Sequence, residues 1–226
     1  IAECLGGNGV LWQRFWQPLA LAVVNTELDQ ASAGLLWPVL KETFGRGEKA
    51  CRPMIPKLGL SDAFIDPALA YLRQGGASIA FNQRLRRLSL ENGRVSGLEF
   101  ADHRIEVATD DAVILAVPPT QAAILLPDLD PPSETRAIVN GHFRLPAAHQ
   151  APPLLGLIGG TAEWLFARGD VVSVTVSAAD GIVNEPSEAL AGRMWADIVR
   201  AYDLGDQPLG GYRIIKEKRA TFAQTP

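Results

Sequence analysis

The chain has 226 residues, of which 47% are hydrophobic and 20% charged, the composition of an ordinary globular protein with a substantial core. Its 21 basic and 25 acidic residues give a net charge of −4, which excludes a general electrostatic attraction to nucleic acid. Two cysteines, Cys4 and Cys51, make no disulfide framework. The three histidines, His103, His142 and His149, lack ligand spacing, so we expect no metal.

Nothing in the sequence indicates a segment that crosses a membrane. No apolar run approaches the roughly 20 residues that span a bilayer. The chain also opens without a basic segment followed by an apolar one, so we expect no signal peptide. These features favour a cytoplasmic location.

Two helices are predicted in the first 44 residues. The first, residues 11–25, has apolar side chains at i, i+3, i+4 and i+7 on one face, namely Trp12, Phe15, Trp16 and Leu19. Pro18 should kink it, because proline lacks a backbone donor. The second, residues 32–44, is interrupted by Pro38 and followed by a glycine- and proline-rich loop.

The middle of the chain, residues 66–119, predicts a helix, a β-meander and a buried strand. Asp66 can cap a helix over residues 67–74, and Gly75 suits the left-handed residue that ends it. Asn92-Gly93 is typical of a type I′ hairpin, whose central residues both take positive φ. The predicted strands cover residues 77–81, 84–91, 94–100, 104–108 and the apolar run 112–117, which suits a strand covered on both faces.

The remainder predicts a second body of strands and helices. A short helix over residues 121–126 ends at Pro127. Residues 187–202 have the helical spacing of Leu190, Met194, Ile198 and Tyr202. Strands are expected over residues 137–144, 154–158, 164–167, 171–178 and 211–218. The fold class is therefore α/β (α+β).

Several short motifs together resemble one family. They are FWQPL (residues 15–19) with Asn25-Thr26, Gly75-Gly76, LAVPP (115–119), GLIGGTAEW (156–164), SAAD (177–180) and EKRATFAQTP (217–226). With these the chain resembles the squalene-associated FAD-dependent desaturases, or hydroxysqualene dehydroxylases, of the amine oxidase and phytoene desaturase superfamily.

The resemblance implies a flavoprotein with two dinucleotide-binding-type domains. Its substrate domain, a mixed sheet with helices, would comprise residues 1–65 and 120–215. Residues 66–119 would be the meander part of the FAD domain, and residues 216–226 would return toward that domain. Such crossing is expected where one domain is inserted in another.

One feature of the family is missing. Its members open with a Gly-x-Gly-x-x-Gly loop that holds the FAD pyrophosphate at a helix N-terminus. Gly6, Gly7 and Gly9 follow no hydrophobic strand, so we interpret them as a turn. We therefore expect a central fragment of a longer FAD enzyme that is inactive alone and does not retain FAD.

The resemblance also implies site residues. Leu85 would offer its backbone N–H and C=O to the adenine, and Val117-Pro118 would lie near the flavin; an ordinary core strand and a plain crossover are the alternatives. Trp12, Phe15, Trp16 and Trp37 would line a tunnel for an apolar isoprenoid, or simply fill the core.

Removal of an allylic hydroxyl needs a proton donor beside the oxygen. Lys218, Arg219 and Gln224 are the candidate catalytic residues on the return segment, whose alternative role is that of a charged edge strand. Asn25 and Asp180 are further candidate polar groups in the substrate cavity.

The implied function is reductive dehydroxylation of hydroxysqualene to squalene. The alternatives are a desaturase, an amine oxidase with an aromatic cage, and a lipid-binding module without redox chemistry. The apolar substrate class alone favours peripheral contact with the inner membrane.

Overall fold

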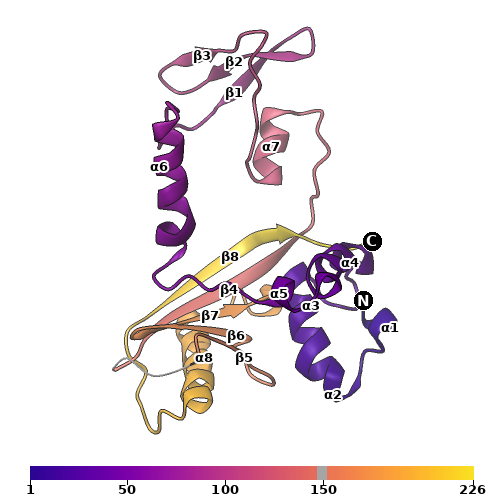
Figure 1. Cartoon of the computed structure of the whole chain (residues 1–226), viewed down its shortest axis with the longest axis vertical. Helices are drawn as coiled ribbons and strands as arrows, with labels where there is room; N and C mark the ends of the chain where they lie inside the picture. Colours follow the sequence, from indigo (N-terminus) through magenta and orange to yellow (C-terminus); the bar gives the residue numbers. More distant parts are fainter. Residues whose placement is uncertain (147–151) are drawn as a thin grey trace. The chain divides into compact units, whose positions relative to one another are not determined.

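The computed structural model describes residues 1–146 and 152–226, so His149 lies outside the described residues. The chain forms two compact units. Unit 1 comprises residues 1–58 and 134–226, and unit 2 comprises residues 59–133. Unit 1 is therefore assembled from two segments that are separated in sequence by the whole of unit 2 (Figure 1).

A five-stranded antiparallel sheet forms the centre of unit 1. Its strands are β4 (Thr135–Arg144), β5 (Leu154–Gly156), β6 (Trp164–Arg168), β7 (Val171–Val176) and β8 (Tyr212–Phe222). They lie in the order β5-β6-β7-β4-β8, each antiparallel to its neighbour. The mixed α/β class is confirmed, and the predicted strands of this region exist with shifts of up to four residues at their ends.

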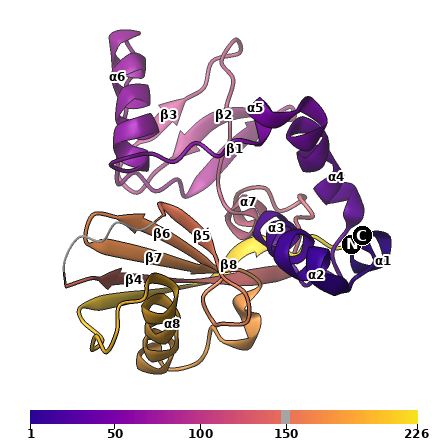
Figure 2. The ribbon, with the colours of Figure 1, turned by 60° about the horizontal axis from the view of Figure 1, so that its bottom comes forward.

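Helix α8 (Ser187–Tyr202) covers one face of this sheet (Figures 1 and 2). Every second side chain of β4 and β7 is buried, because alternate residues of a strand point to the same face. Val139 and Phe143 of β4 thereby meet Met194 and Ile198 of α8 in one hydrophobic cluster. The helix prediction for residues 187–202 is confirmed at both ends.

Short helices form the N-terminal part of unit 1. They are α1 (Ala2–Leu5), α2 (Gly9–Leu11), a π-helical turn (Trp12–Trp16), α3 (Gln17–Val24), α4 (Ala33–Glu42), a 3-10 turn (Phe44–Arg46) and α5 (Glu48–Cys51). Where a kink was predicted at Pro18, the preceding turn is π-helical: the Gln17 N–H bonds to the Trp12 carbonyl, five residues back. A second cluster, including Trp12, Ala20, Val24 and Leu36, forms their core.

Unit 2 contains a three-stranded antiparallel meander and two helical segments. The strands are β1 (Arg87–Glu91), β2 (Arg94–Glu99) and β3 (Arg104–Glu106). The helical segments are a π-helical turn (Ser61–Ile65) that runs into α6 (Asp66–Gln74), and α7 (Pro119–Leu125). The predicted hairpin is confirmed: φ is +51° at Asn92 and +75° at Gly93.

Four predictions for unit 2 were wrong in detail. The turn at Ser61–Ile65 continues into α6, so Asp66 lies inside helical structure and its side chain caps nothing. The left-handed residue after α6 is Gly76, since Gly75 has φ −78°. Residues 77–81 and 112–117 form no strand. A strand needs a hydrogen-bonded neighbour, and in the described part of unit 2 nothing pairs with either run.

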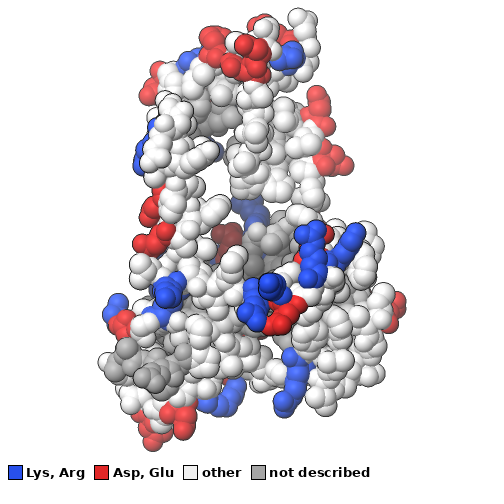
Figure 3. All heavy atoms as spheres, in the orientation of Figure 1, with Lys and Arg blue, Asp and Glu red and all other residues white. Residues whose placement is uncertain are grey.

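Apolar side chains remain exposed in unit 2, where much of the surface in view is uncharged (Figure 3). Ile114 is 90% exposed, and Phe64, Tyr71 and Phe81 are also exposed. Both hydrophobic clusters of the described residues lie in unit 1.

Two negative findings apply to the described residues. No helix among them is both long and apolar enough to cross a bilayer. Nor do three or more His, Cys, Asp or Glu side chains gather there in a way that could hold a metal ion.

Candidate functional site

A groove in unit 1 lies between the π-turn and α3 on one side and the loop that joins β5 to β6 on the other. We call it the Glu163 groove; its volume is about 440 Å³. Its lining combines polar and apolar groups: Gln13, Gln17, Pro18, Leu21, Leu157, Ile158, Gly159, Gly160, Ala162 and Glu163. Residues 157–163 belong to the GLIGGTAEW motif, so this motif builds one wall of the groove.

Asp197 of α8 fixes that wall. Its buried carboxylate accepts the backbone N–H groups of Thr161 at 2.7 Å and Ala162 at 2.9 Å. Arg200, one turn further along α8, donates to the other carboxylate oxygen at 2.7 Å. A Cβ atom at Gly160 would lie 2.6 Å from the carboxylate oxygens, so only glycine lets the loop approach so closely. The groove wall is therefore held on the rigid helix that carries the core.

Glu163 is a carboxyl group with an unusual environment. Its Oε2 accepts the Ser177 backbone N–H at 2.8 Å. Burial raises its pKa above the ordinary value; the bonds from Ser177 oppose the rise, and the nearby charge of Glu27 adds to it. A raised carboxyl pKa in a groove is the property expected of a group that holds a proton for a ligand.

Asn25 links three segments that are distant in sequence. Its Oδ1 accepts the Ala178 backbone N–H at 2.6 Å, and its Nδ2 donates to the Thr221 hydroxyl at 2.9 Å. Asn25 is buried and has left-handed backbone, with φ +44°, and Ala178 has φ +43°. A left-handed conformation is uncommon outside glycine and persists where surrounding contacts impose it. We call this set of contacts the Asn25 junction.

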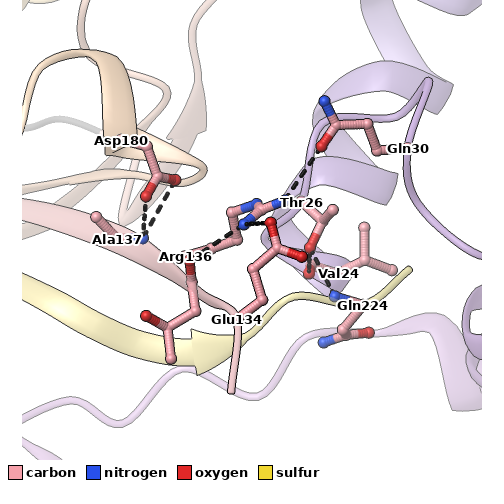
Figure 4. A network of polar contacts seen from close by, with 9 residues as sticks. Val24, Thr26, Gln30, Glu134, Arg136, Ala137, Asp180 and Gln224 are labelled. Atoms are coloured by element: carbon pink, nitrogen blue, oxygen red, sulfur yellow. Dashed lines mark hydrogen bonds and ion pairs between the residues drawn. The ribbon is translucent and has the colours of Figure 1, made fainter. Parts of the chain in front are cut away.

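Thr26 extends the junction to the C-terminal segment (Figure 4). Its hydroxyl donates to the Val24 carbonyl at 3.1 Å and accepts the Gln224 N–H at 3.0 Å. The Gln224 carbonyl in turn accepts the Ser32 N–H at 2.8 Å. The residues after β8 are therefore fastened by their backbone to the N-terminal helices.

The β4–β8 pairing contains a bulge next to this junction. Arg136 pairs with Thr221 and Ile138 with Glu217, so three residues of β8 (Lys218, Arg219 and Ala220) lie opposite Ala137 alone. The Ala137 N–H bonds to the Asp180 carboxylate, 3.3 Å from both oxygens (Figure 4). Asp180, suggested as a cavity polar group, is exposed and has this structural contact.

Arg136 completes the network of Figure 4. Its guanidinium donates to Glu134 at 3.0 Å and to Gln30 at 3.1 Å, so it joins β4 to the turn before α4. Its side chain is 13% exposed, whereas that of Glu134 is 68% exposed. This arginine was not singled out from the sequence, where nothing distinguishes it from other strand arginines.

The aromatic residues predicted to line a tunnel have different environments. Trp12 is buried in the N-terminal cluster. Phe15 packs edge-on against Trp16 at 4.9 Å and against Phe44 at 5.6 Å between ring centroids. Trp37 on α4 is 64% exposed. The structure thus brings Phe15 and Trp16 together and leaves Trp37 apart on the surface.

The three residues predicted to be catalytic all lie in or directly after β8. The Lys218 ammonium group donates to Asn184 Oδ1 at 2.8 Å on the exposed side of the strand. Arg219 is exposed, and no acidic partner for its guanidinium occurs within the described residues. Gln224 is fixed through its backbone, as described above. Lys218 and Arg219 form part of the bulge.

The predicted cofactor contacts lie in unit 2. Leu85 precedes β1. This strand was predicted to begin at residue 84 and begins at Arg87. Within the described residues the Leu85 N–H and C=O make no backbone hydrogen bond, whereas the adjacent Arg86 N–H bonds to the Glu99 carbonyl at 2.8 Å. A free donor and acceptor at one residue fit the edge of an adenine ring. Val117 and Pro118 lie directly before α7, with Pro118 as its N-cap residue.

The sequence did not point to Asp197 or Glu163 as side chains of the candidate site. Glu163 was inside a motif already quoted, directly before a strand tryptophan. The signal for Asp197 was weaker: a carboxylate on the inward side of an otherwise apolar helix face, which must find partners when buried.

The antiparallel sheet covered by α8, together with a separate three-stranded meander, defines a fold that is known from solved structures. A crystal structure from Exiguobacterium sp. 255-15, of a protein assigned as a protoporphyrinogen oxidase, shares this fold. It matches with a TM-score of 0.65 and 18% identity over 95% of this chain and 53% of that one. The profile of the flavin-containing amine oxidoreductases matches residues 4–150, and the chain belongs to this family.

Curated relatives narrow the resemblance. A hydroxysqualene dehydroxylase of Sinorhizobium fredii is 42% identical over 97% of this chain and 52% of its own length. Those of Rhodopseudomonas palustris and Zymomonas mobilis are 42% and 36% identical, over 100% of this chain and 54% of their own lengths. The chain therefore spans about half the length of the curated relatives it matches.

Proposed function

We propose that this chain is the substrate-side part of an FAD-dependent oxidoreductase that reduces hydroxysqualene to squalene. The observation that carries the proposal is the 36–42% identity to three hydroxysqualene dehydroxylases over essentially the whole chain. That range includes both walls of the Glu163 groove and the Asn25 junction.

The chemistry requires three things from the protein. A carbon–oxygen bond must break with its electron pair leaving on oxygen, a proton must reach that oxygen, and a hydride must reach the carbon. FAD, when bound in reduced form, would supply the hydride. The chain's own residues would bind the hydrocarbon, orient the hydroxyl and hold the proton.

Leu85 would contact the cofactor. Its half-buried position and unused backbone N–H and C=O support a role at the adenine. Val117 and Pro118 remain proposed neighbours of the flavin, at the loop that precedes α7. Trp12, Phe15, Trp16 and Trp37 remain proposed substrate contacts, with Phe15 and Trp16 the best supported because they pack together.

The substrate class also supports the proposed location. Squalene and its precursors partition into lipid, so we propose that the enzyme takes its substrate from the surface of the inner membrane, from the cytoplasmic side. This proposal rests on the chemistry of the substrate and not on any membrane-binding element of the chain.

The test uses the full-length flavin-loaded protein without oxygen. After reduction with dithionite, the protein is mixed with hydroxysqualene, and squalene is measured by gas chromatography with mass spectrometry, together with flavin absorbance near 450 nm. We expect one squalene formed per flavin reoxidised. Reduction of the oxidised flavin by squalene would instead indicate the desaturase direction. Flavin reduction by a small amine would indicate an amine oxidase.

A further inference from the structure

The Glu163 groove has the chemical character of a site for an alcohol on a hydrocarbon chain. Gln13, Gln17 and Glu163 are polar, and Pro18, Leu21 and Ile158 are apolar. At about 440 Å³, its size is in the range of small-molecule sites, so it can hold the end of a long isoprenoid but not a complete C30 chain.

We propose that this groove receives the hydroxyl-bearing part of the isoprenoid and that Glu163 is the catalytic proton donor to the leaving hydroxyl. This inference rests on the proposed function. The carboxyl proton is transferred to the oxygen as the carbon–oxygen bond breaks, and water leaves with the bond's electron pair. A bound reduced flavin would supply a hydride to the carbon and would be oxidised by two electrons. The Glu163 carboxylate then takes a proton from solvent.

Glu163 is better suited to donate a proton to the leaving hydroxyl than the other candidates in the chain. An arginine guanidinium holds its protons too tightly to act as a general acid, which argues against Arg219. Gln224 carries no acidic proton, and the Lys218 ammonium group is engaged with exposed Asn184. Asp197 already accepts two backbone N–H groups and one arginine N–H, so its carboxylate is committed to holding the loop.

The surroundings of Glu163 favour its protonated form. The main charged neighbour that acts on it is Glu27, on the turn after α3. Arg193, Asp197 and Arg200 of α8 contact the same loop at Thr161 and Ala162 or pair with one another. No cation is among the causes that act on Glu163, so burial, and after it the Glu27 charge, shift the pKa of this carboxyl upward.

The experiment compares Glu163→Gln with wild type in the full-length flavin-loaded enzyme. Glutamine keeps the shape and the acceptor for the Ser177 N–H but cannot release a proton. We expect the rate of squalene formation to fall about 100-fold or more, as for loss of a general acid. We also expect wild-type activity to decline as pH rises through the raised pKa of Glu163 and the variant to lose that decline. Glu188→Gln, at an exposed position in the first turn of α8, is the matched control.

A binding measurement distinguishes a variant that has lost proton transfer from a variant that is misfolded. Farnesol and farnesene, an isoprenoid alcohol and hydrocarbon of one length, are titrated into the oxidised enzyme while tryptophan fluorescence is followed. We expect wild type and Glu163→Gln to prefer farnesol, and Glu163→Leu to lose about tenfold of that preference, equivalent to a lost hydrogen bond. Circular dichroism verifies that each variant is folded.

The outcomes distinguish the two proposals. Activity of Glu163→Gln within threefold of wild type, with an unchanged pH profile, overturns the role of Glu163 while leaving the proposed function intact. Wild-type enzyme that does not reduce hydroxysqualene overturns the proposed function. In that case the binding arm decides: a farnesol preference abolished by Glu163→Leu supports the alcohol site, and equal affinities refute it.

Discussion

The Oδ1 atom of Asn25 lies 2.6 Å from the backbone nitrogen of Ala178, and both residues have left-handed backbone. They are 153 residues apart in sequence. Two uncommon conformations thus face each other across one hydrogen bond, where the N-terminal helices meet the end of β7. This hydrogen bond stabilises the left-handed backbone of both residues.

We expect Asn25→Gly and Asn25→Asp to separate the contributions of the two side-chain hydrogen bonds of Asn25. Glycine permits the left-handed backbone but removes both hydrogen bonds, and we expect a loss of about 2–3 kcal/mol in unfolding free energy. Aspartate keeps the acceptor for Ala178 and loses the donor to Thr221, and should cost less. All five tryptophans lie in unit 1, so urea unfolding followed by tryptophan fluorescence reports on this unit. Equal stability of both variants and wild type would show that the junction is not stabilising.

Gly160→Ala and Gly192→Ala make a matched pair of substitutions. The new methyl at position 160 would lie 2.6 Å from the Asp197 carboxylate, so we expect a loss of about 1–3 kcal/mol from the displaced loop. At position 192, inside α8, nothing lies within 4 Å of the new methyl, and alanine should stabilise the helix by roughly 0.5–1 kcal/mol. Thermal unfolding measures both. A neutral Gly160→Ala would mean that the loop moves freely away from α8.

The raised pKa of Glu163 predicts a pH dependence of stability. The folded state holds this proton more tightly than the unfolded state, whose value is near 4.5. Stability from this group is therefore complete below that value and is lost as pH rises through the folded pKa. Glu163→Gln should remove this part of the slope. Urea midpoints of variant and wild type, measured at pH steps upward from 4.5, should converge at the acidic end; parallel curves would contradict the assignment.

Leu85→Pro should impair flavin retention by the full-length protein. Proline removes the N–H proposed to face the adenine, and that N–H makes no backbone bond within the described residues, so the meander itself should remain paired. Leu85→Ala, which keeps the N–H, is the control and should retain flavin. The ratio of absorbance at 450 to 280 nm after gel filtration measures the effect. Full retention in the proline variant would remove Leu85 from the cofactor site.

The 226-residue chain by itself should purify without flavin. It lacks a glycine-rich dinucleotide loop in its sequence, so it has no evident means to hold the pyrophosphate. An absorbance spectrum of the purified chain, before and after incubation with excess FAD and desalting, provides the measurement. A yellow product with one flavin per chain would contradict the expectation.

The sequence predicted well those elements that depend on local turn chemistry or on a regular spacing of apolar residues. Helix α8 and the alternating strand β4 have a regular burial pattern, and Asn92-Gly93 allows few turns other than the observed one. Residues 112–117 were predicted as a strand from a continuous apolar run, but a strand forms only beside a hydrogen-bonded neighbour, which the sequence of the run does not specify.

The candidate site was harder to predict, because its contacts join residues far apart. Asn25 and Thr221 are 196 residues apart, and Asp197 and Thr161 are 36 apart. Family resemblance indicated the motifs that contain Glu163, Asn25 and Thr221. It could not indicate that Glu163 lines a groove or that its pKa is raised. Both properties depend on the distant residues that surround the carboxyl group in the fold.

The interleaved order of the units has a consequence for synthesis on the ribosome. Residues 1–58 contribute helices to a body whose sheet begins only at Thr135, and β8, which pairs with β4, is translated later still. Until then the hydrogen bonds of Asn25, Thr26 and Gln30 with the later segments cannot all form, so the helices of residues 1–58 lack part of their anchor. Chaperones that bind nascent chains would therefore act on this protein mainly during that interval.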